Sequence, residues 1–76
     1  MEKITAMFMV STEVERAIDK FPPFRSPHEG LAIILEEYEE LKAEVFKQHH
    51  VRDTEAMAKE ATQVAAMAVR FLIDLC

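Results

Sequence analysis

Apolar residues recur every three or four positions along most of this chain, and this spacing is typical of one face of an α-helix. In the first third, the residues that follow it are Ile4, Met7, Phe8, Val14, Ala17, Ile18 and Phe21. They predict a first helix from about Glu2 to Lys20. Pro22 and Pro23 end this helix, because proline donates no backbone hydrogen bond and constrains the residue before it.

The segment SPHE marks the start of a second helix. Ser26 is suited to cap it, Pro27 fits its first turn, and Glu29 is placed to reach back and complete a capping box. One apolar stripe follows, formed by Leu31, Ile34, Leu35, Tyr38, Leu41 and Val45. The pattern predicts that the second helix continues to about Lys47.

A third helix is predicted from about Thr54 to Leu75, after the polar connector KQHHVRD, with Asp53 as its N-cap. Its segment VAAMAV is apolar nearly all round, so we expect it to be the most buried element. No segment alternates as a strand would. We therefore predict an all-α fold, with residues 1–76 as a single domain. The short connector favours an antiparallel hairpin of the second and third helices.

Hydrophobic residues make up 50% of only 76 residues. A domain of this size buries only about 60% of the surface that its unfolded chain exposes. The single Cys76 allows no intrachain disulfide. The apolar surplus therefore predicts that the chain pairs with itself, as a homodimer or a tetramer, and completes a four-helix type of core.

The charge balance excludes one class of partner. The chain has 14 acidic and 9 basic residues, a net charge of −5, and no run of Lys or Arg, so duplex nucleic acid is not an expected partner. The most apolar stretch, ATQVAAMAVRFLIDLC, is interrupted by Arg70 and Asp74 and is too short to span a bilayer. We expect a cytoplasmic protein with no membrane partner.

The segment LEEYEELKAE concentrates carboxylates on the second helix. On a helical wheel, Glu36 and Glu39 lie well away from the apolar stripe and are expected to be solvated. Glu37 lies at the border of the stripe, and Glu40, three residues on, projects from the same side. On this helix alone, the pattern is more typical of a charged boundary whose side-chain stems are packed and whose carboxylates are solvated.

The third helix favours a more specific interpretation. Glu60 lies in the middle of its apolar face, with Gln63 beside it. A lone buried carboxylate costs several kcal/mol unless it is paired, protonated or bound to a metal. The alternative to a metal is an ion pair between Glu60 and Arg70. In an antiparallel hairpin, Glu37, Glu40, Glu60 and the amide oxygen of Gln63 converge, and such oxygen ligands suit Mg²⁺ or Mn²⁺.

These residues resemble the motifs of the MazG-like family of all-α nucleoside triphosphate pyrophosphohydrolases. Residues 36–40, EEYEE, match the EExxE motif of that family, and residues 60–63, EATQ, stand in place of its ExxD motif. The resemblance covers roughly residues 27–75, and the first helix carries no motif. It implies that Glu37, Glu40 and Glu60 are ligands of Mg²⁺, with Gln63 at the fourth position and Glu36 as a catalytic acid that orients water.

The function that the resemblance implies is Mg²⁺-dependent hydrolysis of a nucleoside triphosphate to the monophosphate and pyrophosphate. Gln63 departs from the family pattern, because an amide offers neither the charge nor the basicity of Asp. The alternative is therefore a non-catalytic MazG-like helical interaction module with a degenerate metal site. A helical-hairpin regulator that binds a partner helix is a third interpretation, but it leaves Glu60 unexplained.

The remaining polar residues carry weaker signals. His49 and His50 have no third ligand at a recognised zinc spacing, and no glycine-rich phosphate loop exists. Basic residues that are candidates for contacting phosphates are Lys47, Arg52, Lys59 and Arg70.

Overall fold

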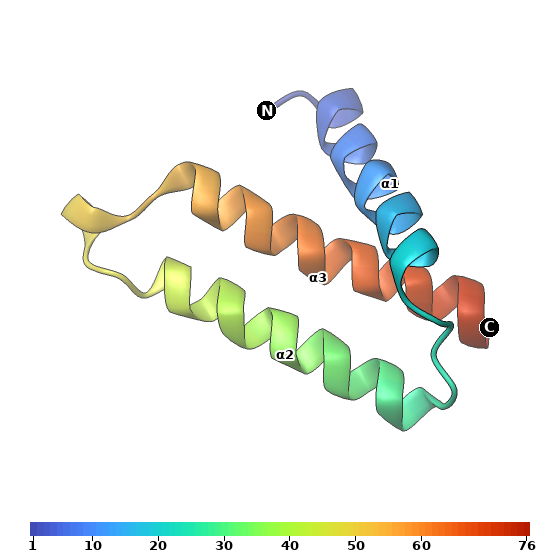
Figure 1. The fold of residues 1–76 in the computed structure, drawn as a ribbon. Helices are drawn as coiled ribbons and strands as arrows, with labels where there is room; N and C mark the ends of the chain where they lie inside the picture. The colour runs from blue at the N-terminus through green and yellow to red at the C-terminus, as the bar shows by residue number, and fades with distance from the viewer.

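The computed structural model describes residues 1–76, and it is all-helical, as predicted (Figure 1). Helix α1 spans Lys3–Lys20, α2 spans Pro27–Val45 and α3 spans Thr54–Leu75, with a short 3₁₀ turn, η1, at His49–Val51. The helix α2 ends two residues before the predicted Lys47, and part of the polar connector forms η1. No helix is both long enough and apolar enough to cross a membrane.

The helices α2 and α3 form the predicted antiparallel hairpin, with the connector at one end (Figure 1). The helix α1 packs against α3 and makes no close backbone approach to α2. Thus α3 is the central element, flanked by α1 and α2. This arrangement decides which side chains can meet, because residues of α1 and α2 can face each other only across α3.

Local capping interactions fix the starts of α2 and α3. Ser26 Oγ accepts a hydrogen bond from the backbone N–H of Glu29 at 3.1 Å, and Asp53 Oδ1 accepts one from Glu55 at 2.9 Å. The carboxylate of Glu29 reaches back to the N–H of Arg25 at 3.0 Å, one residue before the cap, rather than to that of Ser26. The guanidinium of Arg25 binds the same carboxylate, which accounts for the displacement.

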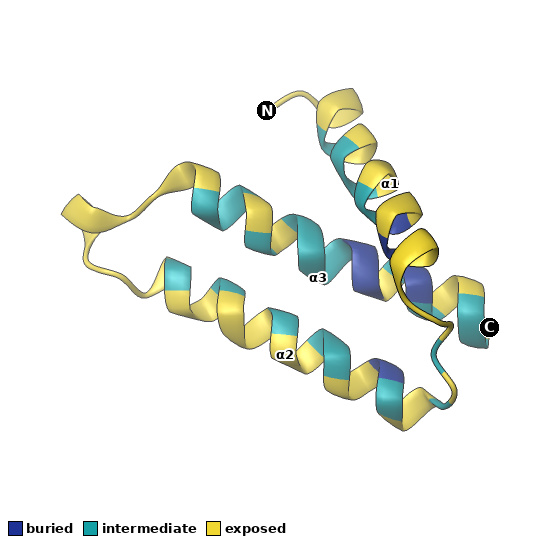
Figure 2. Cartoon of the chain, in the orientation of Figure 1, coloured by how far each residue is buried: buried dark blue, intermediate teal, exposed yellow.

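The core is small and lies where α1 crosses α3 (Figure 2). Its buried apolar residues are Val14 and Ala17 of α1 and Ala66 and Met67 of α3. The helix α2 approaches α3 closely at Gly30, where an added Cβ would lie 2.7 Å from the ring of Phe71. A side chain at position 30 would therefore push the two helices apart.

Arg70 joins α3 to the end of α1. The side chain is only 3% exposed, and it donates to the carbonyl oxygens of Ala17 at 2.6 Å and Phe21 at 2.7 Å. Its Nε also donates to Asp74 at 3.0 Å, and Asp74 accepts from the backbone N–H of Phe24 at 2.9 Å. The alternative in which Arg70 neutralises Glu60 is therefore wrong, because its guanidinium pairs with Asp74 and donates to the carbonyl groups that end α1.

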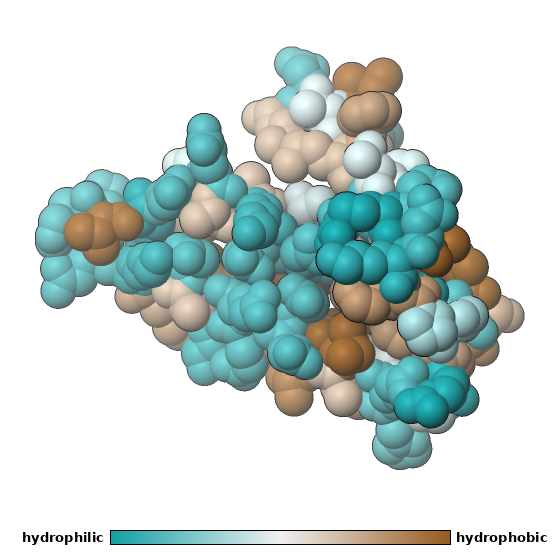
Figure 3. All heavy atoms as spheres, viewed as in Figure 1, coloured by the Kyte–Doolittle hydropathy of each residue, from teal (hydrophilic) through white to brown (hydrophobic).

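Many large apolar side chains remain at the surface, where Figure 3 shows brown groups among hydrophilic ones. On α2, the exposed members Leu31, Leu35 and Tyr38 follow helical spacing and form one outward stripe. On α1, Ile4, Met7 and Phe8 lie beyond the crossing with α3 and are also exposed. The three helices of a single chain therefore leave much of the apolar surface uncovered.

Candidate metal centre and its cleft

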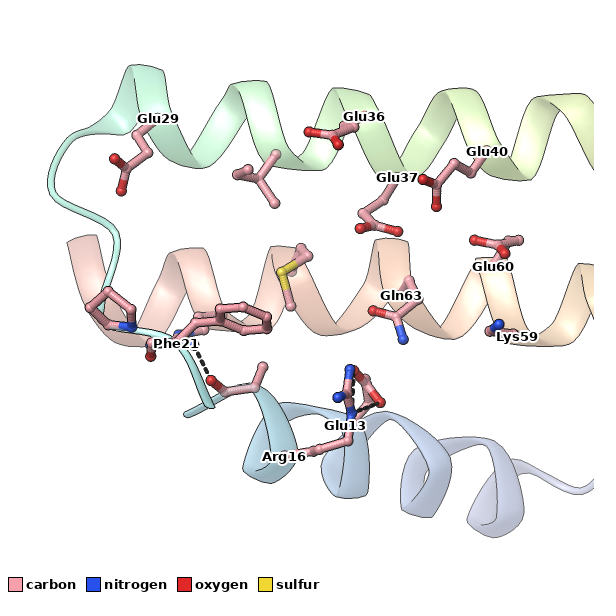
Figure 4. A pocket seen from close by; sticks show the side chains of 15 residues that line it. Glu13, Arg16, Phe21, Glu29, Glu36, Glu37, Glu40, Lys59, Glu60 and Gln63 are labelled. Carbon is pink, nitrogen blue, oxygen red and sulfur yellow. Dashed lines mark hydrogen bonds and ion pairs between the residues drawn. The ribbon is translucent and has the colours of Figure 1, made fainter. Parts of the chain in front are cut away.

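Three carboxylates converge between α2 and α3 (Figure 4). Glu37 and Glu40, one turn apart on α2, face Glu60 of α3, and one carboxylate oxygen from each lies within 4.8 Å of the other two. The convergence follows from the antiparallel hairpin, which sets the middle of α2 opposite the first half of α3. We refer to Glu37, Glu40 and Glu60 as the carboxylate cluster.

Burial and repulsion within the cluster disfavour the ionised forms of Glu37 and Glu60. The pKa of Glu37 rises to about 7, first because burial disfavours the charged form and then because Glu40 and Glu60 lie close. Burial and the neighbouring Glu40 also raise the pKa of Glu60, an effect that Lys59 opposes. The four ion pairs of the chain involve none of the three carboxylates. Protons or a bound cation are therefore needed to relieve the repulsion.

The cluster opens into a cleft of about 490 Å³ between α1 and α2, with α3 along its floor. Its volume lies within the range of small-ligand sites. Nine of the fifteen lining residues are charged, six of them glutamates and three of them basic, so charged groups are available to a ligand.

The two remaining predicted site residues also line the cleft, but they lie outside the cluster. Glu36 is exposed, and Figure 4 shows its carboxylate directed away from Glu60. Gln63 lies on the α1 side of the cluster, near Glu13, and its amide helps to lower the pKa of that carboxyl. The structure therefore brings together three of the four predicted ligands and places Gln63 beside them.

Sequence reasoning missed the wall that α1 contributes. Glu13 and Arg16 line the cleft and form an ion pair in which Arg16 Nη2 donates to Glu13 Oε2 at 2.6 Å and Nε donates to Oε1 at 3.0 Å. The available signal was an acid and a base of opposite charge three residues apart on one helix. That signal does not show which helix face meets α3, so it could not place the pair in the cleft.

Two of the four residues predicted to contact phosphates line the cleft, and two lie outside it. Lys59 lines the cleft, whereas Lys47 pairs with Glu44 at 2.8 Å and Arg52 lies exposed beside η1. Arg70 borders the cleft, but each of its three nitrogens donates to Ala17, Phe21 or Asp74. Of the four predicted residues, Lys59 is the one that lies in the cleft without an intramolecular partner.

No protein-family model, curated protein or solved structure matches the chain. The functional interpretation therefore rests on the carboxylate cluster and its cleft.

Proposed function

We propose that this protein hydrolyses a nucleoside triphosphate to the monophosphate and pyrophosphate in a Mg²⁺-dependent reaction, with Mn²⁺ as an alternative cation. The observation that carries the proposal is the convergence of Glu37, Glu40 and Glu60 at the edge of a cleft, with none of the three in an ion pair. The MazG-like resemblance of residues 36–40 and 60–63 supports the choice of reaction.

The residues present fit a divalent cation. Carboxylate oxygens are the hard ligands that Mg²⁺ prefers, and Mg²⁺ sites commonly combine carboxylates with substrate phosphates. The raised pKa values of Glu37 and Glu60 fit a cluster that becomes fully ionised when a cation is bound. Such a cation supplies charge stabilisation to the phosphoryl oxygens. A protein of net charge −5 does not attract a triphosphate by its own field.

The side chains of this protein have separate roles in the proposed reaction. In the proposed reaction, a water oxygen bonds to the α-phosphorus and the bond from that phosphorus to the bridging oxygen breaks, so pyrophosphate leaves. Glu37, Glu40 and Glu60 hold the cation. Glu36, exposed on the cleft wall, orients the water. Cys76 is unpaired, which fits the reducing cytoplasm in which we propose that the protein acts.

A second candidate is a non-catalytic MazG-like helical module whose metal site is degenerate. The specific observation that favours it is Gln63, which supplies no charge to the cluster and lies beside Glu13, whose pKa it helps to lower. In this case Glu37, whose pKa is raised to about 7, remains partly protonated, and the apolar surface of the helices mediates interactions. The two candidates differ in whether pyrophosphate is released.

Release of pyrophosphate from a panel of ribo- and deoxyribonucleoside triphosphates, with Mg²⁺ or with a chelator, tests the proposal. We expect Mg²⁺-dependent release, and the nucleotide preference emerges from the same panel. Glu40→Gln should abolish the release, while the exposed Glu39→Gln, outside the cluster, should retain it. Absence of release from every nucleotide, by a protein that binds Mg²⁺, would favour the non-catalytic module.

A further inference from the structure

The cleft that holds the carboxylate cluster is also lined by basic residues. The carboxylate cluster lies between α2 and α3, while Arg16 of α1 and Lys59 of α3 supply positive charge toward the α1 side (Figure 4). Arg70 also borders the cleft, but its nitrogens are committed to α1 and Asp74. Arg16 and Lys59 are therefore the cations that remain to meet an anion in the cleft.

The contacts of Arg16 allow its guanidinium to exchange Glu13 for a ligand anion. Its Nε and Nη2 donate to Glu13, whereas its Nη1 donates to no group of the chain. The Arg16 side chain is 52% exposed, but that of Glu13 is only 14% exposed. An ion pair within one helix whose arginine is half exposed contributes little to stability, so Glu13 positions the guanidinium without preventing its exchange to another anion.

Glu13 has a second polar neighbour besides Arg16. The amide of Gln63 lies beside the Glu13 carboxylate, and Arg16 first and Gln63 second lower the pKa of this group. The ionised carboxylate would thus remain partly satisfied without the guanidinium. A phosphate group carries more charge than a carboxylate and accepts the same paired hydrogen bonds from arginine, so exchange of Glu13 for a phosphate is favourable.

We propose that Arg16, assisted by Lys59, binds a phosphate group of the nucleotide at the wall opposite the carboxylate cluster, and that Glu13 holds Arg16 in the cleft until the nucleotide arrives. This inference rests on the proposed function, since it assigns the contacts of the same substrate. It gives α1, which carries no motif, a direct part in substrate binding. It also gives Gln63 a role, because its amide favours the ionised form of Glu13, which holds Arg16.

Calorimetric titration with inorganic triphosphate and Mg²⁺ tests Arg16 without dependence on the base or on turnover. We expect Arg16→Gln to weaken binding by about tenfold or more, as loss of a charged hydrogen-bond pair does. The matched control is Arg25→Gln. Arg25 forms a similar pair with Glu29, but its side chain is 87% exposed and it does not line the cleft. Equal affinities for the two variants would overturn the proposal.

Arg16→Gln leaves the Glu13 carboxylate without its ion-pair partner, and a second comparison removes this effect on binding. Glu13→Gln releases Arg16 and should tighten triphosphate binding, and the double variant Glu13→Gln with Arg16→Gln should lose that gain. If the single and double variants bind equally, Arg16 makes no contact with the ligand and the inference is wrong. In the unsubstituted protein, the Arg16 Nε–H resonance should shift when triphosphate is added, and an unchanged resonance would likewise overturn it.

The outcomes separate this inference from the proposed function. If the unsubstituted protein binds Mg²⁺-triphosphate and releases pyrophosphate, but Arg16→Gln does both equally well, the inference fails and the function stands. If the unsubstituted protein does neither, both fail. Weakened triphosphate binding by Arg16→Gln, with Mg²⁺ binding alone unchanged, supports the inference.

Discussion

Glu37 shows how position alone changes the chemistry of a side chain. An unperturbed Glu has a pKa of about 4.3, whereas burial and the neighbouring Glu40 raise that of Glu37 to about 7. Between these two values, the folded chain binds more protons than the unfolded chain. The contribution of Glu37 to the free energy of unfolding therefore falls as the pH rises through this window.

The first prediction is that the protein in chelator is less stable at pH 7.5 than at pH 5.5, and that Glu37→Gln reduces this difference. The raised pKa of Glu60 acts in the same direction, so part of the dependence should persist in the variant. Thermal melts at both pH values measure it. An identical pH dependence for the variant and the unsubstituted protein would contradict the assigned cause.

Gln63 separates the two candidate functions. For a working site, Gln63→Asp should add a fourth acid, which repels the cluster in chelator and attracts the cation when Mg²⁺ is present. It also replaces the amide that helps to lower the pKa of Glu13 with a second acid. We therefore expect a variant that is less stable than the unsubstituted protein in chelator, but that gains more stability from Mg²⁺.

Melts of both proteins, in chelator and in Mg²⁺, distinguish the candidates. A larger response of the variant to Mg²⁺ would support the enzyme. Equal responses to Mg²⁺ would favour the non-catalytic module, in which Gln63 acts only on the pKa of Glu13.

At the scale of helices, the contact of α1 with α3 depends on Arg70. Breaking a buried ion pair by removing one partner costs about 3–5 kcal/mol, because the other charge is left buried and unpaired. We predict a loss of this size for Arg70→Met, since Asp74 is only 7% exposed and two carbonyl groups of α1 would also lose their donor.

Arg25→Met is the matched control, because Arg25 also pairs with an acid four residues on, but at the surface. An exposed pair contributes about 1 kcal/mol or less. Denaturant unfolding measures both variants, and similar losses for the two would contradict the role assigned to Arg70.

The same helices show what sequence can and cannot predict. The starts of α2 and α3 were predictable, because Ser26, Pro27 and Asp53 act on neighbouring backbone groups. The pairing of α2 with α3 followed from a short connector. The position of α1 was not predictable, because it depends on Arg70 reaching carbonyl groups some fifty residues away. The cleft wall that α1 forms was missed for the same reason.

For the molecule as a whole, the uncovered apolar surface predicts self-association. The outward stripe Leu31, Leu35 and Tyr38 on α2 has no partner within the chain, and so small a core stabilises a chain of this length only marginally. We expect at least a dimer in sedimentation, and Leu35→Glu should shift it toward the monomer. A stable folded monomer at micromolar concentration would contradict this prediction.

A cation held between Glu37 and Glu40 of α2 and Glu60 of α3 would link two helices, and the proposed function and the Arg16 inference both depend on it. The most direct test is calorimetric titration of Mn²⁺ and Mg²⁺ into the unsubstituted protein, Glu60→Gln and the exposed control Glu39→Gln. We predict saturable binding that Glu60→Gln weakens by about tenfold or more and that Glu39→Gln leaves unchanged. Failure of the unsubstituted protein to bind either cation at millimolar concentration, or equal weakening by both substitutions, would contradict the carboxylate cluster as a metal site.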